Sequence, residues 1–156
     1  MPPFLPDTSC MVAAMCAWHE HHDRAREEIE RRLHHAETLL VAAPALVETY
    51  SVLTRLPPPH RLSAADALTL LEGNFMSAGK IIALDARSYR TLLRRAPRNG
   101  IAGGRTYDAI IAECARKVKG TTLLTFNLSH FMPFARMGLE IVMPGHRWAA
   151  ARQLIR

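Results

Sequence analysis

The chain has 156 residues, of which 49% are hydrophobic, so it is long and apolar enough to fold as one domain with its own core. That composition excludes a disordered or collagen-like protein. Lysine and arginine number 20 against 14 aspartates and glutamates, and the resulting formal net charge of +6 favours the approach of a polyanion such as nucleic acid.

Apolar residues recur with the period of strands in some segments and of helices in others. In chain order, the expected elements are a strand ending near Asp7, helices over residues 9–18 and 23–37, a strand over 38–42, helices over 44–56 and 63–75, a strand over 80–84, helices over 85–96 and 105–118, and strands over 121–126 and 139–143. Strands that alternate with helices predict an α/β fold around a mainly parallel sheet.

Local signals place several helix ends. Pro44 stands in the first turn of its helix, and the run PPP directly follows the end of that helix. Ser63 is expected to cap the next helix, which should close near Gly73, and Asp85 is expected to cap the helix after it. No break in composition divides the chain, so we expect one domain over residues 1–145, with residues 146–156 as a basic tail of the same domain.

The sequence also suggests a compartment. No apolar stretch approaches the ~18 residues of a membrane span, and the N-terminal segment MPPFLPDTSC lacks the features of a signal peptide. Cys10, Cys16 and Cys114 lie among apolar residues without CxxC spacing, so we expect buried, reduced thiols. We therefore predict a cytoplasmic protein without a membrane partner.

Polar groups are expected to gather at one edge of the sheet. Asp7 ends the first strand and Asn127 follows another, and ligands of open parallel sheets bind beyond the carboxyl ends of the strands. Asp108 begins the helix that leads into the second of these strands. Glu48 has the apolar neighbours Ala45 and Val52 on its helix, which places it beside a packed stripe.

Each of these residues also has an ordinary structural explanation. Asp7 can cap the helix that follows it, and Asp108 can accept bonds from helix N–H groups or favour the helix dipole. Glu48 can belong to a salt bridge and Asn127 to a turn. Together, however, crowded carboxylates would repel one another unless a cation neutralised them. Oxygen ligands of this kind suit Mg²⁺ or Mn²⁺.

At this point the chain resembles a known family, the PIN-domain ribonucleases, and within it the VapC-type toxins of bacterial toxin–antitoxin pairs. The resemblance spans nearly the whole chain, and it rests on the segments PDTS at Asp7, ALVETYSVL at Glu48, GGRTYDAIIAECA at Asp108 and LLTFNLSHF at Asn127. It implies a PIN-like three-layer α/β/α domain with a central sheet of about five strands.

The resemblance also implies the chemistry. In this family the acids that correspond to Asp7, Glu48 and Asp108 bind the catalytic metal, and a fourth position, often aspartate, completes the pocket. That fourth position is Asn127 here, and an amide brings no charge, so a second metal should bind more weakly than in a four-acid site. The reaction implied is metal-assisted hydrolysis of an RNA phosphodiester.

Neighbouring residues are candidates for substrate contacts. Thr8 and Ser9 would lie beside the metal, although ordinary helix capping accounts for them equally well. Arg105 is a candidate phosphate contact by charge and position. The implied partners are an RNA substrate such as tRNA or rRNA and a cognate antitoxin, with assembly as a homodimer or a toxin–antitoxin hetero-oligomer.

Two other readings stay open. The missing fourth acid is compatible with a non-catalytic PIN-fold module that binds RNA or regulates, and a related DNA nuclease is disfavoured by the small size of the chain. The cluster His19, His21 and His22 suggests a metal site, but it lacks the i, i+4 spacing of helical ligand histidines, so we interpret it as the surface start of a helix.

Overall fold

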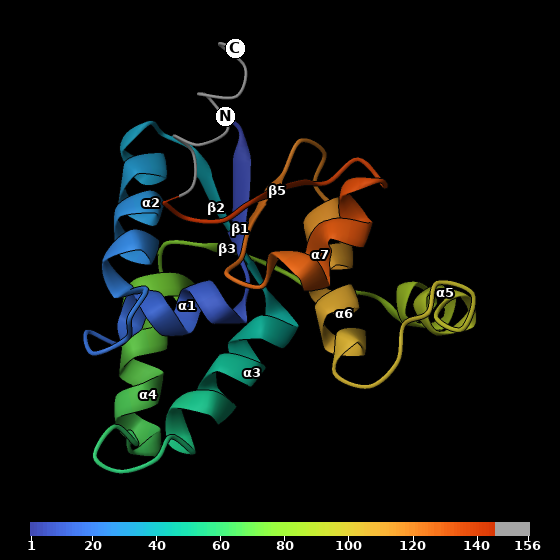
Figure 1. The fold of residues 1–156 in the computed structure, drawn as a ribbon. Helices are drawn as coiled ribbons and strands as arrows, with labels where there is room; N and C mark the ends of the chain where they lie inside the picture. Colours follow the sequence, from blue (N-terminus) through green and yellow to red (C-terminus); the bar gives the residue numbers. More distant parts are fainter. Residues whose placement is uncertain (146–156) are drawn as a thin grey trace.

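The computed structural model describes residues 1–145 of the chain. At its centre is a sheet in which the strands follow the order β3-β2-β1-β4-β5, and every pairing is parallel (Figure 1). Its strands are β1 (Pro3–Pro6), β2 (Thr38–Ala42), β3 (Lys80–Ile82), β4 (Thr122–Leu124) and β5 (Glu140–Val142). The expected parallel sheet is therefore confirmed.

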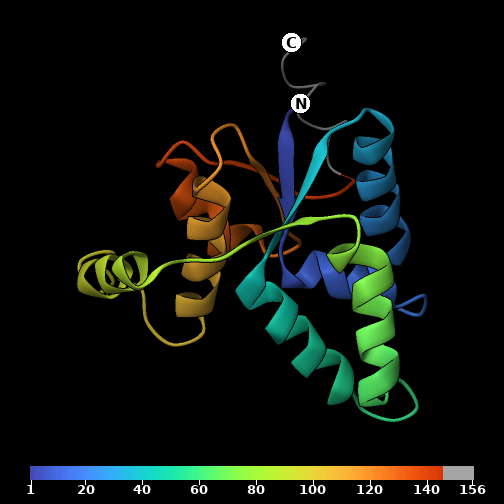
Figure 2. The same ribbon diagram turned by 180° about the vertical axis from the view of Figure 1, so that it is seen from behind.

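Helices lie on both sides of this sheet and beyond its carboxyl edge. They are α1 (Thr8–Met15), α2 (His22–His34), α3 (Ala43–Thr54), α4 (Ala64–Leu71), α5 (Ala86–Arg95), α6 (Arg105–Arg116) and α7 (Leu128–Ala135). Helices α1 and α2 pack together on one side of the sheet and α6 and α7 on the other, as Figures 1 and 2 show from opposite directions. Helix α5 lies outermost, beyond α6. This is the expected three-layer α/β/α arrangement.

The two central strands carry the core. Phe4 and Leu5 of β1 and Leu123 and Leu124 of β4 are all fully buried, as befits strands with helices over both faces. Their register pairs Leu5 with Leu123. Because the strands run parallel and in this register, the residues that follow them emerge side by side at the carboxyl edge, which brings Asp7 next to the end of β4.

Some boundaries differ from the expected ones. Helix α1 ends at Met15 rather than at residue 18, which leaves a loop before α2. Helix α4 does not close near Gly73 but continues as a π-helical turn over Glu72–Met76, and this turn buries Phe75 in the core. The expected caps are confirmed, since Ser63 accepts the N–H of Asp66 and Asp85 accepts that of Ser88.

Helix α7 is absent from the expected elements. Its segment contains Pro133, which normally ends a helix, and it is only 8 residues long. Phe131 and Phe134 are both buried on it. The burial of these two rings, which only the tertiary structure provides, stabilises a helix that local sequence preferences do not predict.

Cys10, Cys16 and Cys114 are buried free thiols, as expected. Within residues 1–145, no helix is both long and apolar enough to cross a membrane. The expected basic tail at residues 146–156 lies outside the described residues.

Candidate active site

Asp7 is held at the carboxyl edge of the sheet by three hydrogen bonds. Its Oδ1 accepts the Ser9 hydroxyl at 2.6 Å and the Cys10 N–H at 2.9 Å, while its Oδ2 accepts the Thr125 hydroxyl at 2.6 Å. The bond from Cys10 makes Asp7 the N-cap of α1, so the structural explanation for this residue is correct. Capping uses only part of the carboxylate, however, because the bond from Thr125 to the other oxygen ties it to the end of β4.

The Asp7 carboxyl is poorly solvated. Its side chain is only 3% exposed, and this burial raises its pKa from 3.8 to about 6. The charge of Asp108 raises the pKa further, whereas the hydrogen bonds from Ser9, Thr125 and Cys10 lower it. A buried carboxyl with a second acid nearby is stabilised in its charged form by a cation, and its charged form is the one that can bind a metal.

Asp108 does not cap its helix. Gly104 occupies the N-cap position of α6, and the Asp108 carboxylate instead bonds to the imidazole of His130 on α7, with Nδ1 and Oδ2 3.1 Å apart. Partial burial raises the Asp108 pKa, while His130 and Arg105 lower it. Asp108 lies in the first turn of α6, so the expected place in the helix dipole is confirmed, whereas the expected capping bonds are absent among the described residues. Asp108 also lines the same cavity as Asp7, as expected.

Glu48 lies in the middle of α3 with its side chain half-buried. Within residues 1–145 it has no hydrogen bond or ion pair, so the salt bridge expected as the alternative is not found in this part of the chain. A half-buried carboxylate without a counter-charge is costly unless a ligand supplies one.

The three acids line one cavity of about 420 Å³. Thr8, Ser9 and Asn127 line it too. The hydroxyl of Thr8 is buried there and lacks a hydrogen-bond partner among the described residues, which is unusual for a buried polar atom. This hydroxyl is therefore available to a group that enters the cavity.

Asn127 begins α7, and its exposed side chain makes no capping bond. Its backbone N–H donates to the Thr125 hydroxyl at 2.8 Å, which holds the residue at the rim of the cavity. Arg105 does not line this cavity but a neighbouring one, together with His130. Its charge nevertheless acts on Asp108.

No three His, Cys, Asp or Glu side chains of residues 1–145 converge tightly enough to form a complete metal site by themselves. The donors around the cavity are oxygens of carboxylate, hydroxyl and amide groups, which suit a hard divalent cation. Mg²⁺ usually keeps several of its waters and binds through one or two carboxylates, so it does not require a closed protein cage. The donor set therefore fits Mg²⁺ or Mn²⁺ better than a thiolate- or imidazole-binding metal.

Comparison with known proteins places this chain in a family. Residues 4–136 match the PIN domain. The chain is 40% identical over 136 residues to ribonuclease VapC40 of Mycobacterium tuberculosis, a match that covers 87% of this chain and 95% of the relative. The chain belongs to the PIN-domain VapC ribonucleases.

Solved structures agree on the fold. DNA-bound VapBC from Salmonella typhimurium superposes with a TM-score of 0.66 at 21% identity, covering 92% of this chain and 98% of that one. VapC20 from Mycobacterium tuberculosis, a sarcin-ricin loop cleaving toxin, superposes with a TM-score of 0.65 at 19% identity. That match covers 90% of this chain and 99% of VapC20. At such identities these structures support the PIN fold alone.

The VapC cavity also includes residues that were not expected there. His19, Glu20 and His21, from the loop between α1 and α2, also line it. The clustered histidines of the segment WHEHHDRA are a sequence signal for this part of the cavity. Their lack of the i, i+4 spacing of helical ligand histidines argues against a metal site, but that criterion does not apply to residues of a loop. His130 was missed because nothing in its local sequence places it next to Asp108.

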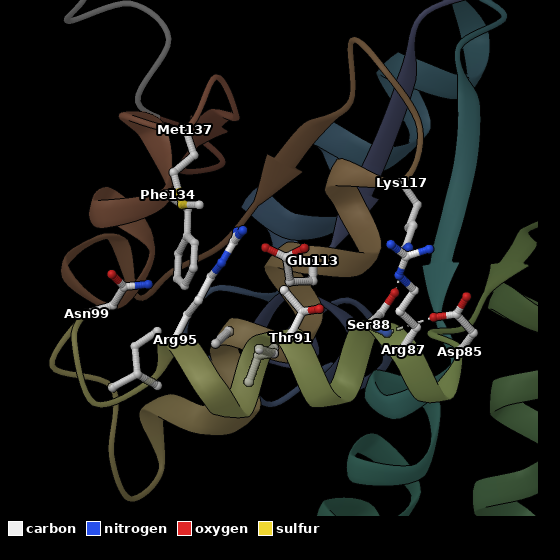
Figure 3. A pocket seen from close by; sticks show the side chains of 13 residues that line it. Asp85, Arg87, Ser88, Thr91, Arg95, Asn99, Glu113, Lys117, Phe134 and Met137 are labelled. Atoms are coloured by element: carbon white, nitrogen blue, oxygen red, sulfur yellow. Dashed lines mark hydrogen bonds between the residues drawn. The ribbon is translucent and has the colours of Figure 1, made fainter.

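A second cavity of this VapC protein is separate from the acids. It measures about 430 Å³ and lies between α5, α6 and the end of α7 (Figure 3). Arg87, Arg95 and Lys117 line it, and the Lys117 ammonium donates to the Ser88 hydroxyl at 2.7 Å. Asp85 and Glu113 line it as well (Figure 3), so this cavity carries charges of both signs and is distinct from the acidic site.

Proposed function

We propose that this VapC ribonuclease is an endoribonuclease that hydrolyses RNA phosphodiester bonds in the Asp7 cavity with the help of Mg²⁺ or Mn²⁺. Asp7, Glu48 and Asp108 would hold the cation, and Asn127 would complete the catalytic set. The observation that supports this most strongly is the Asp7 carboxyl, buried and with its pKa raised to about 6 in the same cavity as two further acids. PIN-domain ribonucleases generally depend on divalent metals.

The bound cation would polarise the phosphoryl oxygen and lower the pKa of the attacking water. Ser9 and Thr125 keep the Asp7 oxygens oriented, because both donate to that carboxylate. His130 does the same for Asp108. These bonds fix Asp7 and Asp108 before the substrate arrives, and no protein nucleophile is needed.

The two small hydroxyls have different roles. The Ser9 hydroxyl donates to Asp7 and accepts the Phe126 N–H at 3.1 Å, so it positions groups of the protein. The Thr8 hydroxyl has no partner within residues 1–145 and can bond to a phosphate oxygen of the RNA. Arg105 would attract a neighbouring phosphate from outside the cavity.

Asn127, an amide, affects how many cations the Asp7 cavity can bind tightly. Its amide oxygen can coordinate a cation or hold a bound water, but it adds no negative charge. We therefore expect one tightly bound cation and a weaker second one, rather than two equal sites.

The toxin role implies an antitoxin partner. The solved VapBC structure from Salmonella typhimurium holds a toxin of this fold with its partner on DNA. We propose that a small antitoxin encoded next to this gene binds the present chain and places a basic side chain in the acidic cavity. Co-expression tests this, because the neighbouring reading frame should relieve toxicity; failure would remove the toxin role but leave the nuclease.

Cleavage of RNA with and without metal tests the enzyme. We expect cleavage with Mg²⁺ or Mn²⁺, complete loss in excess EDTA and recovery when metal is restored. Glu48→Gln should weaken Mn²⁺ binding in calorimetry and reduce cleavage without lowering the melting temperature, because Glu48 has no partner in the described chain. Glu72→Gln, an exposed acid elsewhere, is the matched control.

Two outcomes would contradict the proposal. Undiminished cleavage in EDTA by the purified wild type, with Asp108→Asn equally active, would exclude a metal-dependent site. Binding of RNA without cleavage at any metal concentration would instead favour the non-catalytic PIN-fold module.

A further inference from the structure

The loop of residues 16–21 between α1 and α2, here called the histidine loop, is held in place from both ends. The His19 N–H donates to the Cys16 carbonyl at 2.9 Å, and the His22 N–H donates to the His19 carbonyl at 3.0 Å. The His22 ring donates from Nδ1 to the Ala13 carbonyl at 2.8 Å. Trp18 stacks on His60, with ring centroids 4.2 Å apart. The loop is therefore organised before any ligand binds.

His21 is fixed against the acidic cavity. Its ring stacks on Phe126 with centroids 4.4 Å apart, and its Nδ1 accepts a hydrogen bond from Arg24. The guanidinium of Arg24 also lies over the Phe126 ring, 5.6 Å from the centroid. Because the Phe126 N–H donates to Ser9, this stack is connected to the group that orients Asp7. The position of His21 is thus coupled to the candidate metal site.

The tautomer of His19 follows from its own hydrogen bond. Its Nδ1 accepts the backbone N–H of His21 at 3.0 Å, so in the neutral ring the proton is on Nε2. Burial and the neighbouring His21 lower the His19 pKa, which favours this neutral form. Within residues 1–145, Nε2 has no hydrogen-bond partner, although the ring lines the cavity.

A neutral donor suits this location. A lysine or arginine opposite Asp7, Glu48 and Asp108 would pair with the acids and compete with the cation for them. A neutral imidazole N–H does not compete, yet it can donate to the anionic oxygens of an RNA phosphate. The cavity therefore combines the carboxylates of Asp7, Glu48 and Asp108 for the cation with a neutral donor on His19 for the strand; the exposed Glu20 lines it as well.

We propose that His19 is a substrate-positioning residue, which donates from Nε2 to a phosphate oxygen of the RNA bound in the Asp7 cavity. This inference rests on the proposed function, because it concerns the same cavity. The preorganised histidine loop keeps the donor in place, and His21 fixes its tautomer.

Three substitutions of His19 distinguish the effect of its N–H donor from that of its aromatic ring. His19→Ala removes both, His19→Phe keeps an aromatic ring without the donor, and His19→Gln supplies a new amide donor. We expect Ala and Phe to raise the KM for RNA cleavage about ten-fold or more with little change in kcat, and Gln to restore much of the loss. His34→Ala, an exposed histidine of α2, should behave like the wild type.

Direct binding keeps this test independent of catalysis. In an Asp108→Asn background, fluorescence anisotropy with a short RNA should show weaker binding for His19→Ala and His19→Phe. The Mn²⁺ affinity of each His19 single variant and its melting temperature should stay at the wild-type values.

The two hypotheses fail in different ways. If the wild type cleaves RNA but His19→Phe has the wild-type KM and binding, the inference is wrong and the proposed function stands. Equal losses for Ala, Phe and Gln with a shared fall in melting temperature would show a structural role and overturn the inference. If the wild type does not cleave with any metal, the proposed function fails, and the binding experiment alone then decides the inference.

Discussion

Thr125 donates its hydroxyl hydrogen to Oδ2 of Asp7 at 2.6 Å across 118 positions of sequence. The same hydroxyl accepts the N–H of Asn127. The Thr125 side chain at the end of β4 therefore orients two groups. They are the Asp7 carboxylate at the end of β1 and the backbone at the start of α7. The bond from Thr125 to Asp7 joins two of the four segments that define the site, because the parallel register of β1 and β4 brings their ends together.

The two threonines of the cavity should differ in their effect on stability. Thr125→Val removes two hydrogen bonds and should destabilise the metal-free protein by about 1–3 kcal/mol. Thr8→Val removes a buried hydroxyl that has no partner in the described structure and should leave stability unchanged or slightly raised. Urea unfolding of both variants measures the difference. Equal losses would mean that the Thr8 hydroxyl has a stabilising partner.

The stability of the metal-free protein should depend on Asp7 in a defined pH window. Its folded pKa of about 6 lies above the ordinary value of 3.8, so the neutral form stabilises the fold at low pH. That contribution is fully present below about pH 4 and is lost as the pH rises through 6. The rise of the Asp7 pKa from 3.8 to about 6 corresponds to a change of roughly 3 kcal/mol in the free energy of unfolding.

The variant Asp7→Asn measures this contribution of Asp7 to the pH dependence of stability. The variant keeps the shape without the charge, so its stability relative to the wild type should rise between pH 4 and pH 7 when EDTA is present. Saturating Mg²⁺ should reduce or reverse the advantage, because only the wild type binds the cation well. A difference that is constant across this pH range would contradict the assignment.

Asp108→Asn should separate activity from stability. Loss of the charge should reduce metal-dependent RNA cleavage at least 100-fold, while the melting temperature of the metal-free protein stays equal or rises slightly, because repulsion with Asp7 is relieved. The amide oxygen can still accept from His130. Asp66→Asn, an exposed acid in the first turn of α4, is the control and should retain full activity. Wild-type cleavage by Asp108→Asn would exclude a metal-binding role.

The exposed arginines of α5 should attract RNA in a salt-dependent way. Arg90 and Arg94 are exposed on α5, which projects from the body beyond α6 (Figure 1). Neutralising both to glutamine should reduce the slope of log K against log salt by about 1.4 if each contacts one phosphate of a single strand. The paired variant Arg26→Gln with Arg61→Gln should keep the wild-type slope. Identical slopes in all three proteins would mean that RNA binds to a surface other than α5.

The sequence by itself determined the order of most elements and the residues that meet at the sheet edge. Periodicity marks the strands and the long helices, and the caps Ser63 and Asp85 act over three residues, so local chemistry is sufficient for them. The convergence of Asp7 and Asn127 also follows from sequence, because the carboxyl ends of parallel strands share one edge.

Only the tertiary structure decided the remaining features. Helix α7 forms despite Pro133 because the core buries Phe131 and Phe134, and its position brings His130 to Asp108. The histidine cluster does stand at the start of α2, as expected, but only the tertiary structure brings His19 and His21 to the lining of the cavity. These contacts join residues far apart in the chain, and the free energy that fixes them comes from packing and desolvation, which no short stretch of sequence contains.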